Sequence, residues 1–228
     1  MTSCAESAFQ RAIDLNPSYA EARQFYSHYL TIMGRIEEGT EQMQLALELD
    51  PLNPFVRGLH GVQLFMADDL QGSIRVIEDV MASTPGFGFG YPILIWAYHH
   101  LGEKDKAIAA LANAYRINNV PELALALETA YAKGDYSGAM LSSAQMLEER
   151  SRTVYDDPLY IGNTYEQAGQ VERAIDLYEL SFQITGPSVP YLGALTKTPA
   201  VQSNPRFIKL LRDIKLDYWA DKYSQPSE

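Results

Sequence analysis

Residues 161–187, IGNTYEQAGQVERAIDLYELSFQITGP, decide the fold of this chain. Gly169 predicts a turn between two helices, because glycine suits the left-handed backbone conformation that follows a helix C-terminus. Gly162 and Ala174, one on each side of that turn, are small enough to let two antiparallel helices approach closely. Pro187 follows a glycine and predicts the end of the second helix. The stretch therefore predicts one helix–turn–helix unit.

The same unit recurs with a period of 34 residues, which separates Pro17 from Pro51 and Pro51 from Pro85. Between them, segments such as EKDKAIAALANAYRI place apolar residues at three-to-four spacing, typical of amphipathic helices, and no stretch has the alternation of a strand. A single helix pair cannot bury its own apolar face, so such units must stack on their neighbours. We therefore expect an all-α fold.

This pattern of small residue, aromatic, turn glycine and closing proline resembles the tetratricopeptide repeat (TPR) family. The resemblance implies a right-handed superhelical solenoid of helix–turn–helix repeats. Ser143 stands where an aromatic is usual, so the fourth repeat departs furthest from the pattern. The resulting division is a half repeat at 5–17, five repeats at 20–53, 54–87, 88–121, 120–153 and 155–188, a C-terminal helical cap at 189–223 and a disordered tail at 224–228.

Charge and composition narrow the classes of partner. The 228 residues carry a formal net charge of -11, which repels phosphate backbones and anionic membrane surfaces and attracts basic peptides. Cys4 is the only cysteine, which excludes an internal disulfide and a cysteine zinc cluster. No apolar run approaches the ~20 residues of a membrane-spanning helix, and the N-terminus lacks the apolar stretch of a signal peptide. We therefore expect a cytoplasmic protein that binds neither nucleic acid nor membrane.

The sequence offers no catalytic constellation. His99 and His100 are adjacent and point about 100° apart on a helix, unlike a metal-binding pair at i, i+4. The glycine-rich run at 86–90 has no preceding strand and no following lysine, so we expect an inter-repeat loop and not a phosphate cradle. We expect no enzyme activity, no metal and no cofactor.

The family resemblance implies that the first helix of each repeat lines a concave groove for a peptide or protein. The residues that the register places there are His28, Phe55, Phe65, Phe89, Trp96, His99, Tyr131, Tyr160 and Asn163. Exposed aromatic side chains of this kind mark contact sites. Alternatively, aromatics such as Phe65 and Trp96 belong to the core between helices. The family's clamp for a terminal carboxylate needs lysines, arginine and asparagines, of which Asn163 alone is present, so recognition of chaperone tails is disfavoured.

Two terminal features suggest part of a larger protein. Residues 5–17 match only the second helix of a repeat, and NPRFIKLLRDIKL near the C-terminus resembles the end of repeat regions in bacterial multidomain proteins with a winged-helix or cyclase domain. The sequence thus favours a protein-interaction scaffold within a signalling or regulatory protein. Two alternatives stay open: a self-association element that forms a homodimer through the incomplete N-terminal edge, and the non-catalytic region of a repeat-fused enzyme such as a transferase.

Overall fold

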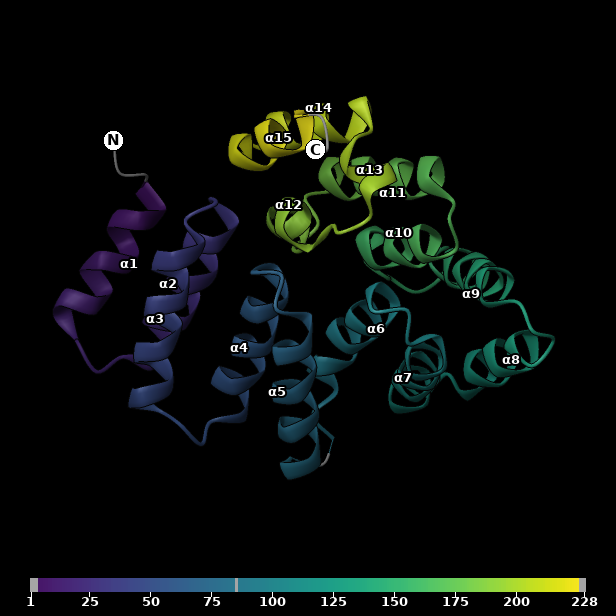
Figure 1. The fold of residues 1–228 in the computed structure, drawn as a ribbon, viewed down its shortest axis with the longest axis horizontal. Helices are drawn as coiled ribbons and strands as arrows, with labels where there is room; N and C mark the ends of the chain where they lie inside the picture. Colours follow the sequence, from purple (N-terminus) through teal and green to yellow (C-terminus); the bar gives the residue numbers. More distant parts are fainter. Residues whose placement is uncertain (1–3, 85, 226–228) are drawn as a thin grey trace. The chain divides into compact units, whose positions relative to one another are not determined.

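A computed structural model describes residues 4–84 and 86–225, and every element in those ranges is a helix. The predicted all-α class is therefore confirmed. The chain divides into two compact units, Met1–Ala97 and Tyr98–Glu228, whose helices are labelled in Figure 1. We describe each unit by itself. Pro85, the third of the regularly spaced prolines, and residues 226–228 of the predicted tail lie outside the described residues.

Unit 1 consists of helical hairpins that pack on one another. Helices α2 and α3 form one hairpin and α4 and α5 the next, α2 also packs against α4, and α1 packs against α2. The first helices of the hairpins thus lie beside each other, as stacking requires. The elements are α1 (Cys4–Leu15), α2 (Ala20–Ile32), α3 (Ile36–Leu49), α4 (Pro54–Met66), α5 (Leu70–Ser83), the 3-10 turn η1 (Gly88–Gly90) and α6 (Tyr91–His100), whose last turn belongs to unit 2.

Unit 2 continues with helices that pack in chain order and ends in a group of shorter helices. Contacts run from α7 to α8, α8 to α9, α9 to α10 and α10 to α11, and α11 also receives α13 and α14. The elements are α7 (Lys104–Ile117), α8 (Pro121–Tyr131), α9 (Tyr136–Arg150), α10 (Pro158–Gln167), α11 (Val171–Gln183), η2 (Val189–Tyr191), α12 (Leu192–Leu195), α13 (Pro199–Gln202), α14 (Pro205–Asp213) and α15 (Asp217–Ser224). Ser224, assigned to the tail from the sequence, is instead the last residue of α15.

Residues in the left-handed backbone conformation make the turns within the hairpins. The prediction of a turn at Gly169 is confirmed, because Gly169 has positive φ, and so have Gly34, Gly102 and Gly134, with values between 74° and 89°. Asp68 takes the same position between α4 and α5 with φ of 68°, a conformation that aspartate tolerates better than most residues. Glycine therefore makes four of these turns, and an aspartate makes the fifth.

Three helices begin with the same capping arrangement. Asn53, Asp157 and Asn204 each precede a proline at the first helical position. Their side-chain oxygens accept a hydrogen bond from the backbone N–H two residues further on, at 2.9 to 3.0 Å. Each cap satisfies a donor that the first helical turn would otherwise leave without a partner.

Close helix contacts explain the small residues of the repeat. A Cβ atom at Gly162 would lie 2.7 Å from Cε1 of Tyr178, so α10 and α11 pack too closely for any side chain there. Ala174 is fully buried in the same contact. In the C-terminal region, Gly193 plays the corresponding part, because a Cβ atom there would meet the fully buried ring of Trp219 on α15.

Arg206 attaches α14 to α11. Its guanidinium pairs with three carboxylates of α11, those of Glu172, Asp176 and Glu179, at 3.1, 2.8 and 2.7 Å. Phe207 beside it is fully buried, with its ring centroid 6.0 Å from that of Tyr178. An apolar contact and an ion-pair network therefore hold the C-terminal helices on the last hairpin. The repeat and cap boundaries derived from the sequence remain our proposal for the register.

Candidate functional site

Unit 1 carries a row of phenylalanine rings that stays open to solvent, which we call the aromatic row: Phe25, Phe55, Phe87 and Phe89. Ring centroids are 6.3 Å apart from Phe25 to Phe55, 5.7 Å from Phe55 to Phe89, and 5.9 Å from Phe87 to Phe89. Phe25 and Phe55 are each 40% exposed and Phe89 44%. Contacting rings that remain this accessible form a continuous apolar strip.

Helix α4 and the turn before α6 position three rings of the row. Phe55 is the second residue of α4, and its N–H donates to the Asn53 cap, so its side chain lies at the helix start. Phe89 belongs to η1, the turn before α6. Gly58, one turn into α4, lacks the Cβ that would lie 2.7 Å from Cζ of Phe87. The glycine-rich segment therefore folds against α4 and adds its two rings to the row.

Of the predicted groove residues in unit 1, three are buried and cannot form an accessible surface. His28 is 2% exposed, Phe65 0% and Trp96 7%. The His28 ring bridges α2 and α4, with Nε2 2.9 Å from the carbonyl oxygen of Leu59, and burial lowers its pKa to about 4. The rings of Phe65 and Trp96 lie 6.1 Å apart. These residues belong to the core, as the alternative interpretation proposed, because neighbouring first helices pack directly on one another.

Two other predicted residues, Phe55 and Phe89, lie in the aromatic row, and the sequence analysis missed its remaining members. Phe25 immediately precedes Tyr26, which is buried, so one of two adjacent aromatics points inward and the other outward. That adjacency was the available signal for Phe25. The sequence predicts a loop at Phe87, and the docking of its ring depends on Gly58, a contact between repeats that no local pattern reveals.

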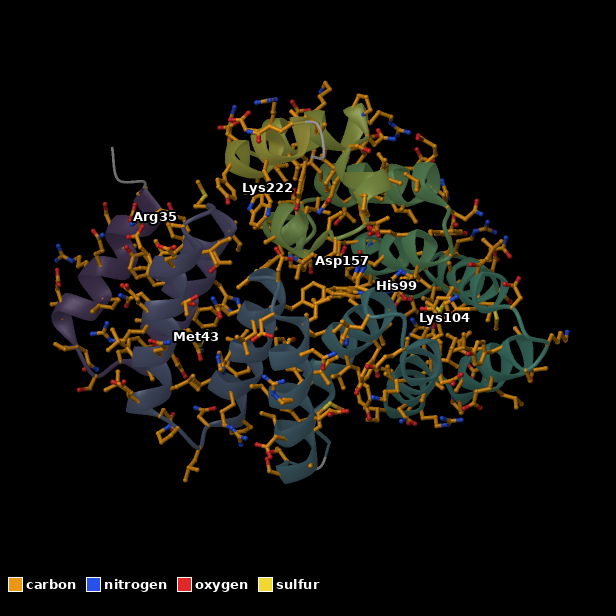
Figure 2. All side chains as sticks on the ribbon, in the orientation of Figure 1. Arg35, Met43, His99, Lys104, Asp157 and Lys222 are labelled. Carbon is orange, nitrogen blue, oxygen red and sulfur yellow. The ribbon has the colours of Figure 1, made fainter. Side chains whose placement is uncertain are left out.

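In unit 2, His99 and Tyr131 are brought together by Tyr136. The Nδ1 atom of His99 lies 3.0 Å from the Tyr136 hydroxyl, and the two rings stack with centroids 5.7 Å apart. Tyr131 meets Tyr136 edge-on at 6.3 Å and donates a hydrogen bond to Asp105 at 2.6 Å. The ammonium of Lys104 lies 5.4 Å from the centre of the Tyr136 ring. His99 and Lys104 are labelled in Figure 2. Burial and this cation lower the pKa of His99.

The other predicted residues of unit 2, Tyr160 and Asn163, lie on α10. Tyr160 is 43% exposed. The Tyr178 hydroxyl lies 2.9 Å from Oδ1 of Asn163 and hydrogen-bonds Glu166, which also accepts from the hydroxyl and backbone N–H of Thr198. Asn163 thus belongs to an internal network, and the chain's own residues around Thr198 cover Glu166.

Unit 1 is more acidic than unit 2. Residues 4–97 contain twelve aspartates and glutamates, five arginines and no lysine, a formal net charge of -7 out of -11 for the whole chain. On α2, four residues before Phe25, the carboxylate of Glu21 accepts a hydrogen bond from Tyr19 at 3.0 Å. The aromatic row therefore lies on a unit with a negative field, which attracts cationic groups over a distance set by the ionic strength.

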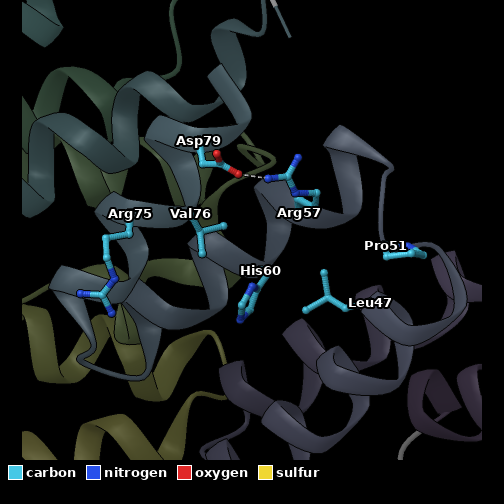
Figure 3. Close-up of a pocket in the computed structure, with 7 residues that line it drawn as sticks. All are labelled: Leu47, Pro51, Arg57, His60, Arg75, Val76 and Asp79. Carbon is cyan, nitrogen blue, oxygen red and sulfur yellow. Dashed lines mark hydrogen bonds and ion pairs between the residues drawn. The ribbon is translucent and has the colours of Figure 1, made fainter. Parts of the chain in front are cut away.

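A second surface feature of unit 1 is a pocket between α3, α4 and α5 (Figure 3). Its volume is about 320 Å³, and its lining residues are Leu47, Pro51, Arg57, His60, Arg75, Val76 and Asp79. Arg57 forms an ion pair with Asp79 across it. Burial lowers the pKa of His60, against the opposing effect of Asp69.

No group of three or more histidine, cysteine, aspartate or glutamate side chains in the described ranges is arranged to hold a metal ion. None of the described helices is both long and apolar enough to cross a bilayer.

Comparisons with known proteins gave matches among solved structures alone. No family model matches the chain, and no curated protein matches it. A structure reported for the functional characterization of Pseudomonas aeruginosa pilF matches over 94% of this chain and 78% of its own, with 14% identity and a TM-score of 0.46. The APC/C hetero-tetramer Cut9–Hcn1 matches over 95% of this chain and 41% of its own, with 14% identity and a TM-score of 0.51.

These similarities concern the fold. The chain spans about two fifths of the Cut9–Hcn1 chain that it matches. Together with the helical pairs and their left-handed turns, the match shows an all-α, TPR-like fold of helix–turn–helix repeats, the class that stacks as a right-handed superhelical solenoid.

Proposed function

We propose that this chain is a non-catalytic protein-interaction scaffold, and that its aromatic row binds a partner segment with apolar side chains flanked by lysines or arginines. One observation carries the proposal: three phenylalanine rings in contact across α2, α4 and η1 each remain 40 to 44% exposed. Single exposed apolar residues are normal on protein surfaces, but a contiguous strip of them is typical of a binding site.

Aromatic rings suit this task because they combine a large apolar area with few rotatable bonds. Covering Phe25, Phe55 and Phe89 with a partner would remove apolar area from water at little cost in side-chain entropy. The rings already pack against one another, with centroids 6.3 Å apart for Phe25 and Phe55 and 5.7 Å apart for Phe55 and Phe89. The surface is therefore organised before binding. Aromatic anchors of this kind dominate the energy of many protein interfaces.

The charge of unit 1 supports the choice of partner. With a formal net charge of -7 and no lysine, residues 4–97 favour the approach of a cationic segment and oppose an acidic one. The expected partner segment therefore places lysines or arginines beside its apolar anchors. The TPR-like fold is consistent with a scaffold role, since its stacked repeats offer extended surfaces for other proteins.

A peptide selection tests the proposal. Purified chain of residues 1–228 is used to select binders from a random twelve-residue peptide library displayed on phage. We expect enrichment of peptides that combine aromatic or aliphatic residues with lysine or arginine. Binding should fail for the double variant F55A/F89A and persist for F182A, because Phe182 is equally exposed, at 40%, but lies on α11 of unit 2.

Two results would overturn the proposal. One is enrichment of peptides that bind F55A/F89A as well as the unchanged chain. The other is a dimer in sedimentation velocity experiments that F55A/F89A dissociates, because the aromatic row would then bind a second copy of this chain.

A further inference from the structure

The pocket between α3, α4 and α5 is separate from the aromatic row and has a distinct chemistry. Leu47 and Pro51 line it on the side of α3, and Val76 lines it from α5. The charged and polar side chains come from α4 and α5, where Arg57 reaches across to Asp79 and His60 points between the helices (Figure 3). A volume of about 320 Å³ lies at the lower end of the range for small-molecule sites.

Every basic residue of a long acidic stretch converges on this pocket. From Ile36 to Ala97 the sequence contains nine aspartates and glutamates but only two arginines, one histidine and no lysine. The three basic residues are Arg57, His60 and Arg75, and all three line the pocket. Scattered surface charge would not place them together, so the pocket is a local basic site on an acidic unit.

The pairing of these groups leaves one positive charge available. Arg57 is neutralised by its ion pair with Asp79. Arg75 makes no ion pair or hydrogen bond with any residue that the structure describes, and His60 likewise makes no hydrogen bond there. With a neutral imidazole, the residues that line the pocket comprise two arginines and one aspartate, a formal net charge of +1, and Asp69 acts on His60 from outside this lining. A single anionic group matches this charge, whereas a dianion such as phosphate would also meet the carboxylate of Asp79.

We propose that this pocket binds a monocarboxylate that carries a short aliphatic stem. The carboxylate pairs with the guanidinium of Arg75 and accepts a hydrogen bond from His60, since arginine matches the geometry of a carboxylate. The stem lies against Leu47, Pro51 and Val76. Such a group occurs in a free short-chain acid and at the C-terminus of a peptide that ends in an aliphatic residue, and both present the same chemistry.

Titration calorimetry and amide NMR spectra of the full chain test this site with defined probes. Hexanoate is the probe for a free acid, and acetyl-Ala-Ala-Leu with a free carboxylate is the probe for a peptide terminus. Their uncharged counterparts are hexanamide and the same peptide as its amide. We expect saturable binding of at least one acid, with shifts of amide signals in α3, α4 and α5, and no binding of the amides. The acid that binds identifies the source.

Arginine variants provide the matched control. We expect R75A to weaken binding of the acid at least tenfold, and R11A, which removes an exposed arginine of α1 in the same unit, to change it less than twofold. The proposal is overturned if neither acid binds, if an amide binds as tightly as its acid, or if R75A and R11A behave alike. Inorganic phosphate that binds as tightly as hexanoate would contradict the role of the apolar wall. A failure here leaves the aromatic row untouched, because the two sites share no residue.

Discussion

The rings of Phe55 and Phe89 lie 5.7 Å apart, although they belong to consecutive repeats and are separated by 34 residues of sequence. Each occupies the second position of its proposed repeat, so the period of the fold places them side by side. Both are about two fifths exposed. The repeat that builds the core therefore also builds the row of rings on the surface.

The row should contribute little to stability. Replacement of Phe55 by alanine removes a ring that is already 40% exposed, so we expect a loss of about 1 kcal/mol in the free energy of unfolding. Urea unfolding followed by circular dichroism measures this value. A loss above about 3 kcal/mol would assign Phe55 to the core and remove it from the proposed binding surface.

Trp96 should behave in the opposite way. Its side chain is 7% exposed and its ring lies 6.1 Å from that of the fully buried Phe65. We expect W96A to cost about 3–5 kcal/mol, the range for a large aromatic removed from a core. The same unfolding experiment checks it, with Y155A as control because Tyr155 is 66% exposed. Equal stability of the two variants would contradict the burial of Trp96.

Gly58 should control the position of Phe87. A Cβ atom at residue 58 would lie 2.7 Å from Cζ of Phe87, so G58A must displace that ring from α4. We expect faster hydrogen exchange of the amides in residues 86–90 in the variant, despite the higher helix propensity of alanine. Unchanged hydrogen exchange in residues 86–90 would show that Gly58 does not control the packing of Phe87 against α4.

Ala174 tests the register of the fifth repeat. It is fully buried, and its carbonyl oxygen would lie 3.1 Å from a Cβ atom at Gly162, so α10 and α11 pack closely there. A leucine there overpacks the contact, and we expect a loss of about 1–3 kcal/mol in A174L. A109L is the control, because Ala109 is exposed on α7. A melting temperature of A174L that equals that of A109L would count against the proposed register.

Burial of His28 should make unit 1 sensitive to acid. The pKa of His28 is about 4 in the folded chain and 6.5 in the unfolded chain. Above pH 6.5 both states hold a neutral imidazole, so the stability is complete. Between pH 6.5 and 4 the His28 imidazole is protonated in the unfolded chain but stays neutral in the folded chain. The free energy of unfolding therefore falls by about 3 kcal/mol in total as the pH is lowered. H28Q should lose less stability over this interval, and an equal loss would contradict the assignment.

The fold could be predicted in detail because its signals are local. A glycine that follows a helix favours the left-handed conformation that ends the helix. The caps at Asn53, Asp157 and Asn204 precede prolines that fit the first helical turn. Asp68 shows the limit of this approach, since it adopts the left-handed conformation that glycine usually supplies. Each of these features depends on a few neighbouring residues, which the sequence displays directly.

The surface could be predicted in part. The register identified Phe55 and Phe89, but it also named His28, Phe65 and Trp96, which neighbouring first helices cover. Helical periodicity tells which face of a helix a residue occupies. It does not tell how closely the next helix approaches that face, and this distance separates a groove from a core. The same limit hid the pocket, where Arg75 of α5 is 18 and 15 positions from Arg57 and His60 of α4.

We propose that the exposed phenylalanine rings of unit 1 provide the binding energy for a partner segment. The dissociation constant of the strongest selected peptide tests this proposal when it is measured by titration calorimetry for the unchanged chain, F55A/F89A and F182A. Loss of two anchors at more than 1 kcal/mol each predicts weakening of more than about 30-fold in F55A/F89A and less than about twofold in F182A. Equal affinities for F55A/F89A and F182A would contradict the account.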